Sequence, residues 1–149
     1  MPHRISRRHF LQRSLAVAST PIFIPRSVLA QGDRPGANSR VGVALIGCGR
    51  RGQSYIDPGL PPRTQIVVAC DVHRTRAELA ARKVNIKDVV QDYRRVLDRQ
   101  DVDAVMIATP EHWHALIAIA ACQAGKHVYV EKPLTLCVVE GRQIGRAHV

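Results

Sequence analysis

Four runs of apolar, partly β-branched residues recur along the chain from residue 40 onward. They occupy residues 41–46, 66–71, 104–108 and 127–131, and a weaker extended piece lies at 89–91. Continuous apolar runs of this length are typical of strands that are buried on both faces of a parallel sheet. The pattern therefore predicts four clear strands and one short additional strand.

Segments with helical character alternate with these runs, at residues 75–83, 93–99 and 113–124. The last segment is apolar nearly all round, which predicts burial against the sheet, and it stops at Gly125, a residue favoured just beyond a helix C-terminus. This alternation predicts an α/β fold, a doubly wound, Rossmann-like parallel sheet with right-handed crossovers, over residues 40–142.

The overall composition agrees with this fold class, but the net charge of the first 30 residues differs from that of the rest of the chain. Of the 149 residues, 46% are hydrophobic and 23% charged, which is ordinary for one globular domain. The net charge is +10, yet the first 30 residues hold five of the 22 Lys and Arg residues and no acid. The other 17 basic residues are scattered among 12 acidic ones, so we expect no nucleic-acid partner.

The N-terminal segment has the order of features of an export signal. Residues 6–12, Ser-Arg-Arg-His-Phe-Leu-Gln, resemble the twin-arginine signal, and a short apolar stretch follows at 15–24. We predict a signal peptide at 1–30, cleaved after Ala30, and a polar linker at 31–39. This implies the twin-arginine export machinery as a partner and a periplasmic or other extracytoplasmic location. The alternative is a disordered basic tail or an uncleaved amphipathic segment.

A glycine-rich loop follows the first strand directly. Its sequence, Gly-Cys-Gly-Arg-Arg-Gly, fits the pattern G-x-G-x-x-G. In this context Gly47 permits a tight turn, Gly49 lets the backbone approach a pyrophosphate, and Gly52 allows close packing of helix on strand. Arg50 or Arg51 would add positive charge there; the alternative for each is a solvated loop arginine.

Asp71 closes the second strand, 19 residues beyond the last glycine of that loop. A carboxylate at this place accepts hydrogen bonds from the adenosine ribose and repels a 2′-phosphate, so it favours NAD over NADP. His73 and Arg74 lie just beyond and would soften that preference. The alternative for Asp71 is an N-cap of the next helix. Loop and carboxylate together predict a dinucleotide site.

Two further motifs stand at the carboxyl ends of predicted strands, where ligands bind in such sheets. Residues 108–114 read A-T-P-E-H-W-H, and residues 131–133 read E-K-P. With the glycine loop and Asp71, this set resembles the N-terminal domain of the Gfo/Idh/MocA oxidoreductase family, from about Val41 to Gly141.

The resemblance implies roles for particular residues around the nicotinamide half of the cofactor. Those expected to contact it are Thr109, Pro110, His112, Glu131 and Lys132. Lys132 would also belong to the catalytic site, where an ammonium can polarise a hydroxyl that loses a hydride and stabilise the developing oxyanion. The alternative is a surface lysine. The Lys132–Pro133 bond is a candidate cis peptide.

We expect no metal site. The four cysteines include no C-x-x-C pair, and three lie in apolar segments, where they are expected to be small core residues. His112 and His114 stand two residues apart on a predicted helix, so their side chains point to opposite sides. We expect packing or helix-start polarity from His114 and a core position for Trp113.

Family members continue beyond E-K-P through the rest of the Rossmann domain. A second α/β domain then supplies most substrate contacts and commonly an acid/base residue. The resemblance thus implies a truncated domain with an incomplete sheet, no C-terminal domain, and a chain that binds NAD but turns over poorly or not at all. At full length a homo-oligomer is expected.

The last residues suggest a non-biological origin. Residues 144–149 can be encoded by ATC GGA AGA GCA CAC GTC, a string found in a widely used sequencing adapter. Our hypothesis is that residues 143–149 are adapter read-through. The alternative is a true stop codon after a coincidental tail.

These observations predict an exported NAD-dependent oxidoreductase, here as its N-terminal part. Its substrate would be a small molecule, a sugar, polyol or related hydroxyl compound, exchanging a hydride with the nicotinamide. Two alternatives remain, a relative of the NAD-dependent glycosidases and a non-catalytic dinucleotide-binding module.

Overall fold

A computed structural model describes residues 39–57 and 59–147 of the chain. The predicted signal peptide and almost all of the predicted linker lie outside the described residues, so both stay predictions. Within the described part, no helix is long and apolar enough to cross a membrane.

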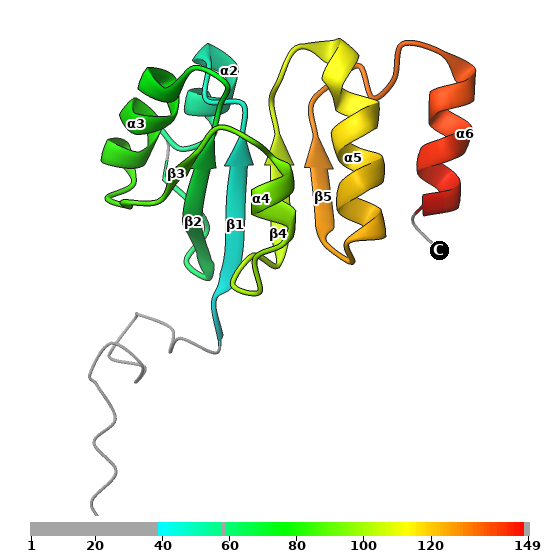
Figure 1. The fold of residues 1–149 in the computed structure, drawn as a ribbon. Coiled ribbons are helices and arrows are strands. Elements are labelled where there is room, and N and C mark those ends of the chain that lie inside the picture. Colours follow the sequence, from blue (N-terminus) through cyan, green and yellow to red (C-terminus); the bar gives the residue numbers. More distant parts are fainter. Residues whose placement is uncertain (1–38, 58, 148–149) are drawn as a thin grey trace, which may run out of the picture.

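Five parallel strands form one sheet, in the order β3-β2-β1-β4-β5 (Figure 1). Their bounds are β1 Val41–Ile46, β2 Thr64–Cys70, β3 Val89–Val90, β4 Ala104–Ile107 and β5 His127–Val130. All five were predicted. Four of them end one residue earlier than predicted; in β2, β4 and β5 this leaves Asp71, Ala108 and Glu131 as the first residues beyond the strand. Each still donates its N–H to the neighbouring strand, to Val90, Ile46 and Ile107 respectively.

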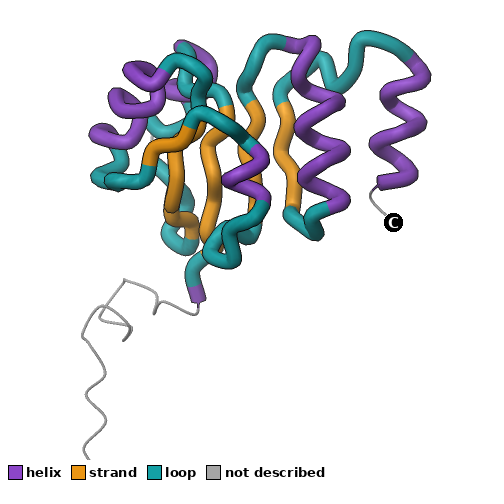
Figure 2. The backbone as a smooth tube through the Cα atoms, in the orientation of Figure 1, coloured by secondary structure: helices purple, strands orange, loops and turns teal. Residues whose placement is uncertain are grey.

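Helices lie on both faces of this sheet (Figure 2). Their bounds are α2 Arg50–Ser54, α3 Arg74–Lys83, α4 Arg94–Leu97, α5 His114–Gln123 and α6 Val138–Ala147, and a 3₁₀ turn at Glu111–Trp113 precedes α5. The predicted helix at 93–99 is therefore shorter than expected, and the one at 113–124 begins with a 3₁₀ turn.

Alternate residues of β1 point into two separate hydrophobic clusters. Ala44 and Ile46 belong to a cluster that contains buried residues of α4 and α5. Val43 and Leu45 belong to a second cluster, which contains the buried alanines of α3. Two clusters on opposite faces are what a doubly wound sheet requires, so the predicted fold class is confirmed.

The C-terminus of α5 has the predicted glycine stop. Gly125 has φ +71°, its N–H donates to Cys122 O, and Lys126 N–H donates to Ala121 O. This pair of bonds is a Schellman motif, which satisfies carbonyls at the helix end.

Helix α6 was not predicted. Residues 143–147, which the adapter hypothesis covers, lie on this helix, and Ile144 packs against the first cluster. The origin of residues 143–149 stays a prediction.

Candidate functional site

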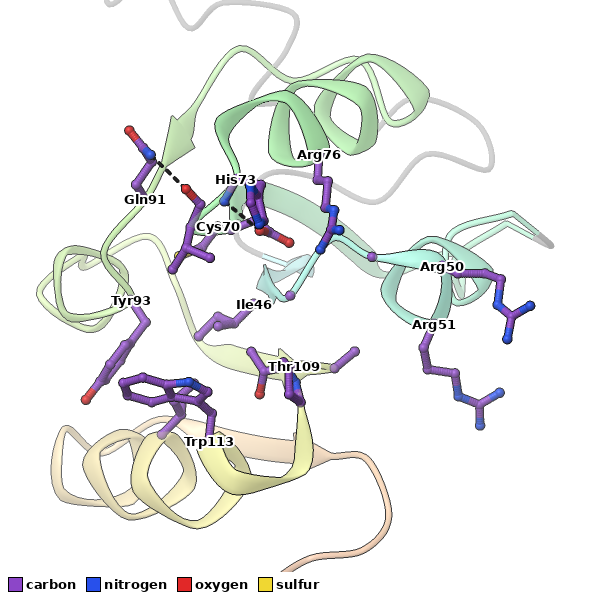
Figure 3. Close-up of a pocket in the computed structure, with 17 residues that line it drawn as sticks. Ile46, Arg50, Arg51, Cys70, His73, Arg76, Gln91, Tyr93, Thr109 and Trp113 are labelled. Atoms are coloured by element: carbon purple, nitrogen blue, oxygen red, sulfur yellow. Dashed lines mark hydrogen bonds between the residues drawn. The ribbon is translucent and has the colours of Figure 1, made fainter.

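Two cavities adjoin at the carboxyl end of the sheet. The first, of about 410 Å³, lies between the glycine loop, the end of β2 and the loop after β4 (Figure 3). The second, of about 550 Å³, extends to the end of β5. Both are lined by Arg51 and by the segment from Ala108 to Pro110. Volumes of this size are typical of small-molecule and cofactor sites.

The glycine loop has no room for a side chain at Gly47 or Gly52, whereas the space around Gly49 is open. Gly47 has φ +92°, and a Cβ there would lie 2.6 Å from the carbonyl of Ala108. A Cβ on Gly52 would collide with the carbonyl oxygen of Gly47, whereas one on Gly49 would meet nothing within 4 Å. These are the three features expected of a loop that turns tightly, packs its helix closely and exposes backbone to a phosphate.

The Asp71 carboxylate ties the glycine loop to the end of β2. It is 8% exposed, and its Oδ2 accepts a hydrogen bond from Cys48 N–H at 2.8 Å. Its Oδ1 accepts from His73 N–H, also at 2.8 Å. The N-cap of α3 is His73, so the alternative role of Asp71 as the N-cap is wrong. Each carboxylate oxygen has a second lone pair, so Asp71 can accept further hydrogen bonds from a ligand.

Two buried thiols belong to this part of the site, Cys48 in the glycine loop and Cys70 at the end of β2. Burial raises the pKa of Cys48 and of Cys70 to about 12, and the nearby Asp71 carboxylate adds to both shifts. Both are small core residues, so the prediction of three such cysteines holds for two; Cys122 is half-buried and Cys137 exposed. Across residues 39–57 and 59–147, no cluster of His, Cys, Asp or Glu could hold a metal ion.

The two loop arginines have different surroundings. Arg50 lines the first cavity and makes no ion pair with any described residue. Arg51 donates from Nε and Nη2 to Glu131 Oε1, at 2.9 and 2.7 Å, and its guanidinium lies 5.2 Å from the centre of the Tyr55 ring. These hydrogen bonds lower the pKa of Glu131, with a smaller contribution from the Lys132 backbone N–H. Arg51 thus joins the helix after the glycine loop to the end of β5.

Arg76, which the sequence motifs did not indicate, lines the first cavity together with Asp71. Arg74 binds Glu78 at 2.8 Å on the surface of α3 and does not line the cavity. His73 does line it, together with Arg76, whose side chain points from α3 into the cavity (Figure 3). Arg74 and Arg76 differ in this way because a shift of two residues along a helix changes the face on which a side chain lies, and an effect of Arg74 on cofactor preference stays a prediction.

Aromatic rings form the opposite wall of the first cavity. Tyr93 and Trp113 meet edge to face, with ring centres 6.5 Å apart. Trp113 is 40% exposed, so the expectation that it is a core residue is wrong. It stands on the 3₁₀ turn, outside the buried face of α5.

The second cavity contains the E-K-P motif. Glu131 Oε2 accepts a hydrogen bond from Lys132 N–H at 3.1 Å, and the Lys132–Pro133 peptide bond is cis, as predicted. Lys132 lines the cavity, and among the described residues its ammonium has no hydrogen-bond partner. The hydroxyl of Thr109, which lies where the two cavities meet, is buried without a partner.

The two histidines of the first motif have different surroundings, and the expectation of packing at the helix start is confirmed for His114, the first residue of α5. His112 is exposed, packs its ring against Trp113 at 6.1 Å between centres, and lines neither cavity. His114 is 2% exposed and lines the second cavity. Only His114 lines one of the two cavities, and cofactor contact by His112 stays a prediction. The sequence spacing does not show which of the two histidines lines a cavity, because this depends on contacts between loops that are far apart in the sequence.

The described residues fit a dinucleotide. The open space at Gly49 accommodates a pyrophosphate, and the buried Thr109 hydroxyl without a partner needs a ligand group to satisfy it. The buried Asp71 carboxylate lies at the end of the first cavity where a ribose would be held.

Comparisons with known proteins agree with this geometry. A family model described as an oxidoreductase family with an NAD-binding Rossmann fold matches residues 41–148. A glycosyl hydrolase family 109 protein from Shewanella sp. (strain ANA-3) is 31% identical over 167 residues, covering 95% of this chain and 36% of that protein. Levoglucosan dehydrogenase from Pseudarthrobacter phenanthrenivorans is 38% identical over 104 residues, covering 62% of this chain and 26% of that enzyme.

A solved structure gives the same match in three dimensions. The myo-inositol dehydrogenase from Lactobacillus casei, in complex with NAD(H) and myo-inositol, superposes with a TM-score of 0.67 at 27% identity. The superposition covers 72% of this chain and 33% of that one. The chain thus spans about a third of the length of these proteins.

Proposed function

Because the chain belongs to the Gfo/Idh/MocA oxidoreductase family and carries its NAD-binding Rossmann domain, we propose that it is the cofactor-binding part of a dehydrogenase that acts on a sugar or polyol. The observation that carries the proposal is the pair of adjoining cavities, with Asp71 at the far side of one and Lys132 in the other.

The first cavity would hold the adenosine half of NAD. Asp71 would accept from the ribose hydroxyls, while backbone N–H groups at the glycine loop and the unpaired Arg50 would face the pyrophosphate. Thr109 and Pro110, which line both cavities, would then contact the nicotinamide half, and the orphan hydroxyl of Thr109 would donate to or accept from it.

The second cavity would hold the substrate beside the nicotinamide. The bound nicotinamide supplies the hydride acceptor or donor. The free ammonium of Lys132 would donate a hydrogen bond to the reacting oxygen of the substrate and stabilise the negative charge that develops on it. Glu131 would hold the Lys132 backbone in place and is itself held by Arg51.

Turnover and binding measurements on Lys132→Met test this role. Because residues 143–149 are hypothesised to be adapter sequence, the gene used for these measurements would be cloned from source DNA that has been resequenced through codon 142 and beyond. With a panel of sugars and polyols, we expect Lys132→Met to lower the rate of nicotinamide reduction about 100-fold or more. NAD affinity should stay within about threefold. Lys87→Met, an exposed lysine away from both cavities, is the control. A Lys132→Met protein with unchanged turnover would contradict the proposal.

A second function has support from one specific comparison. The similarity to glycosyl hydrolase family 109 proteins over nearly the whole chain favours a glycosidase that uses NAD within its cycle. A dehydrogenase accumulates reduced nicotinamide in step with product. A glycosidase of this kind releases sugar with no net change in nicotinamide, so measuring both products distinguishes the two.

We also propose that the protein is exported by the twin-arginine pathway. The proposal rests on the sequence Ser-Arg-Arg-His-Phe-Leu-Gln at residues 6–12. Replacing Arg7 and Arg8 by lysine should keep the protein in the cytoplasm, as measured by cell fractionation. Equal extracytoplasmic amounts of both forms would contradict it. Size measurement on the same material would test the expected homo-oligomer.

A further inference from the structure

His114 connects the two loops that meet at the second cavity. It is the first residue of α5 and is 2% exposed. Its Nδ1 lies 2.7 Å from the carbonyl oxygen of Pro133, and its Nε2 lies 2.9 Å from the carbonyl oxygen of Thr109. One ring therefore bridges the loop after β4 and the loop after β5.

Both bridged peptide units carry groups of the proposed site. Thr109 contributes the buried hydroxyl that has no protein partner. Pro133 directly follows Lys132, whose backbone N–H is already held by Glu131 at 3.1 Å. The His114 contact thus fixes the E-K-P loop on the other side of Lys132.

At the adenosine end of the site, Asp71 is held by contacts that do not include His114. Asp71 is held by the backbone of Cys48 and His73, and Tyr93 packs against Trp113. Asp71, His73 and Tyr93 line the first cavity, whereas His114 does not. A change at His114 should therefore affect the end of the site that contains Thr109 and Lys132 and leave the Asp71 end in place.

We propose that His114 is a positioning residue that sets the separation between the Thr109 hydroxyl and Lys132, and thereby the fit of the nicotinamide half of the cofactor. This inference rests on the proposed function, because it assumes that NAD spans the two cavities. The bridge acts through backbone carbonyls, so His114 itself need not touch the ligand.

Binding of NAD and ADP-ribose to the full chain tests the inference. ADP-ribose has the same adenosine and pyrophosphate but lacks the nicotinamide. His114→Phe keeps a ring and removes both nitrogens. We expect it to weaken NAD about tenfold or more, which corresponds to about 1.4 kcal/mol, and to leave ADP-ribose within about threefold.

Two conservative variants restore one contact each. The side-chain amide of Asn can replace Nδ1 toward Pro133, and that of Gln can replace Nε2 toward Thr109. Each should recover part of the NAD affinity. Loss of ADP-ribose binding would show that His114→Phe does not fold. In that case the Asn and Gln variants test the positioning role instead, by the same comparison of NAD with ADP-ribose.

The outcomes separate the two proposals. A wild-type chain that binds neither ligand would refute the proposed function. Wild-type binding of both, with equal losses of NAD and ADP-ribose in every His114 variant, would show a general role in folding and overturn the positioning role. Unchanged affinity for both ligands in His114→Phe would overturn it as well.

Discussion

Asp71→Asn is the substitution whose effect follows most directly from the geometry. The carboxylate accepts one backbone N–H on each oxygen, from Cys48 and from His73, both at 2.8 Å. An amide has one oxygen and one NH₂ group. Whichever way Asn turns, one buried backbone N–H faces another donor.

The cost can be estimated from these two bonds. A hydrogen bond to a charged acceptor contributes about 1.5–3 kcal/mol, and its loss leaves a donor unpaired. Removing a buried charge returns part of this cost, so we expect a net loss of about 2 kcal/mol in the free energy of unfolding. For a domain of roughly 100 residues, that corresponds to a fall in Tm on the order of 10 °C.

Asp92→Asn is the matched control. Asp92 Oδ1 also accepts a backbone N–H two residues on, from Arg94 at 3.0 Å, but its side chain is 48% exposed. Water can replace the lost acceptor there, so the fall in Tm should be small.

The assay is thermal unfolding followed by circular dichroism, together with NAD titration. We expect Asp71→Asn to lose about tenfold in NAD affinity as well, because the ribose loses a charged acceptor. Asp71→Ala should weaken NAD more than NADP. If Asp71→Asn melts within about 2 °C of the wild type, or no further below it than Asp92→Asn, the estimate based on two charged hydrogen bonds is refuted.

Three further predictions concern neighbouring groups. Arg76 points into the cavity beside Asp71, so Arg76→Ala should lower affinity for NADP more than for NAD in parallel titrations, and equal losses would exclude a role at the 2′ position. Arg51 lowers the pKa of Glu131 below its ordinary 4.5, so the ion pair stabilises the fold above about pH 4.5 and is lost as pH falls through the lower folded value. The fall in Tm between about pH 5 and pH 3 should then be smaller in Glu131→Gln, and an identical fall would contradict this. Burial raises the pKa of Cys48 to about 12, so in the native protein iodoacetamide should modify the exposed Cys137 rapidly and leave Cys48 intact. Mass spectrometry of the modified protein checks this. Comparable rates of modification at the two cysteines would contradict it and show that the glycine loop opens readily.

The strands were predictable because they are buried on both faces. A strand of this kind is a continuous apolar run, so its end is visible where the first polar or turn residue appears. That is why the sequence placed Asp71 and the E-K-P motif at strand ends. Helix α6 lacks such a signal. It contains Gly141 and Gly145, each of which costs about 1 kcal/mol relative to Ala, and its apolar contact through Ile144 depends on the rest of the fold.

The missed parts of the site have the same cause. Arg51 and Glu131 are 80 residues apart, and the Pro133 oxygen lies 19 residues from the ring of His114. Neither contact follows from spacing, because each depends on how two strand ends are brought together. The motif therefore identified the segment that lines both cavities, whereas the side on which His112 and His114 lie depends on the fold.

The position of β1 in the sheet has a consequence for the nascent chain. It is the first described strand to leave the ribosome, yet it becomes the central one, with Val43 paired to both Ile66 and Ala104. At a synthesis rate of about 5–20 residues per second, the roughly sixty residues that separate β1 from β4 take several seconds to appear. During that time one edge of an apolar strand has no partner and can bind a chaperone or another nascent chain. The speed of translation through residues 47–104 should therefore influence how much of the protein is recovered in soluble form.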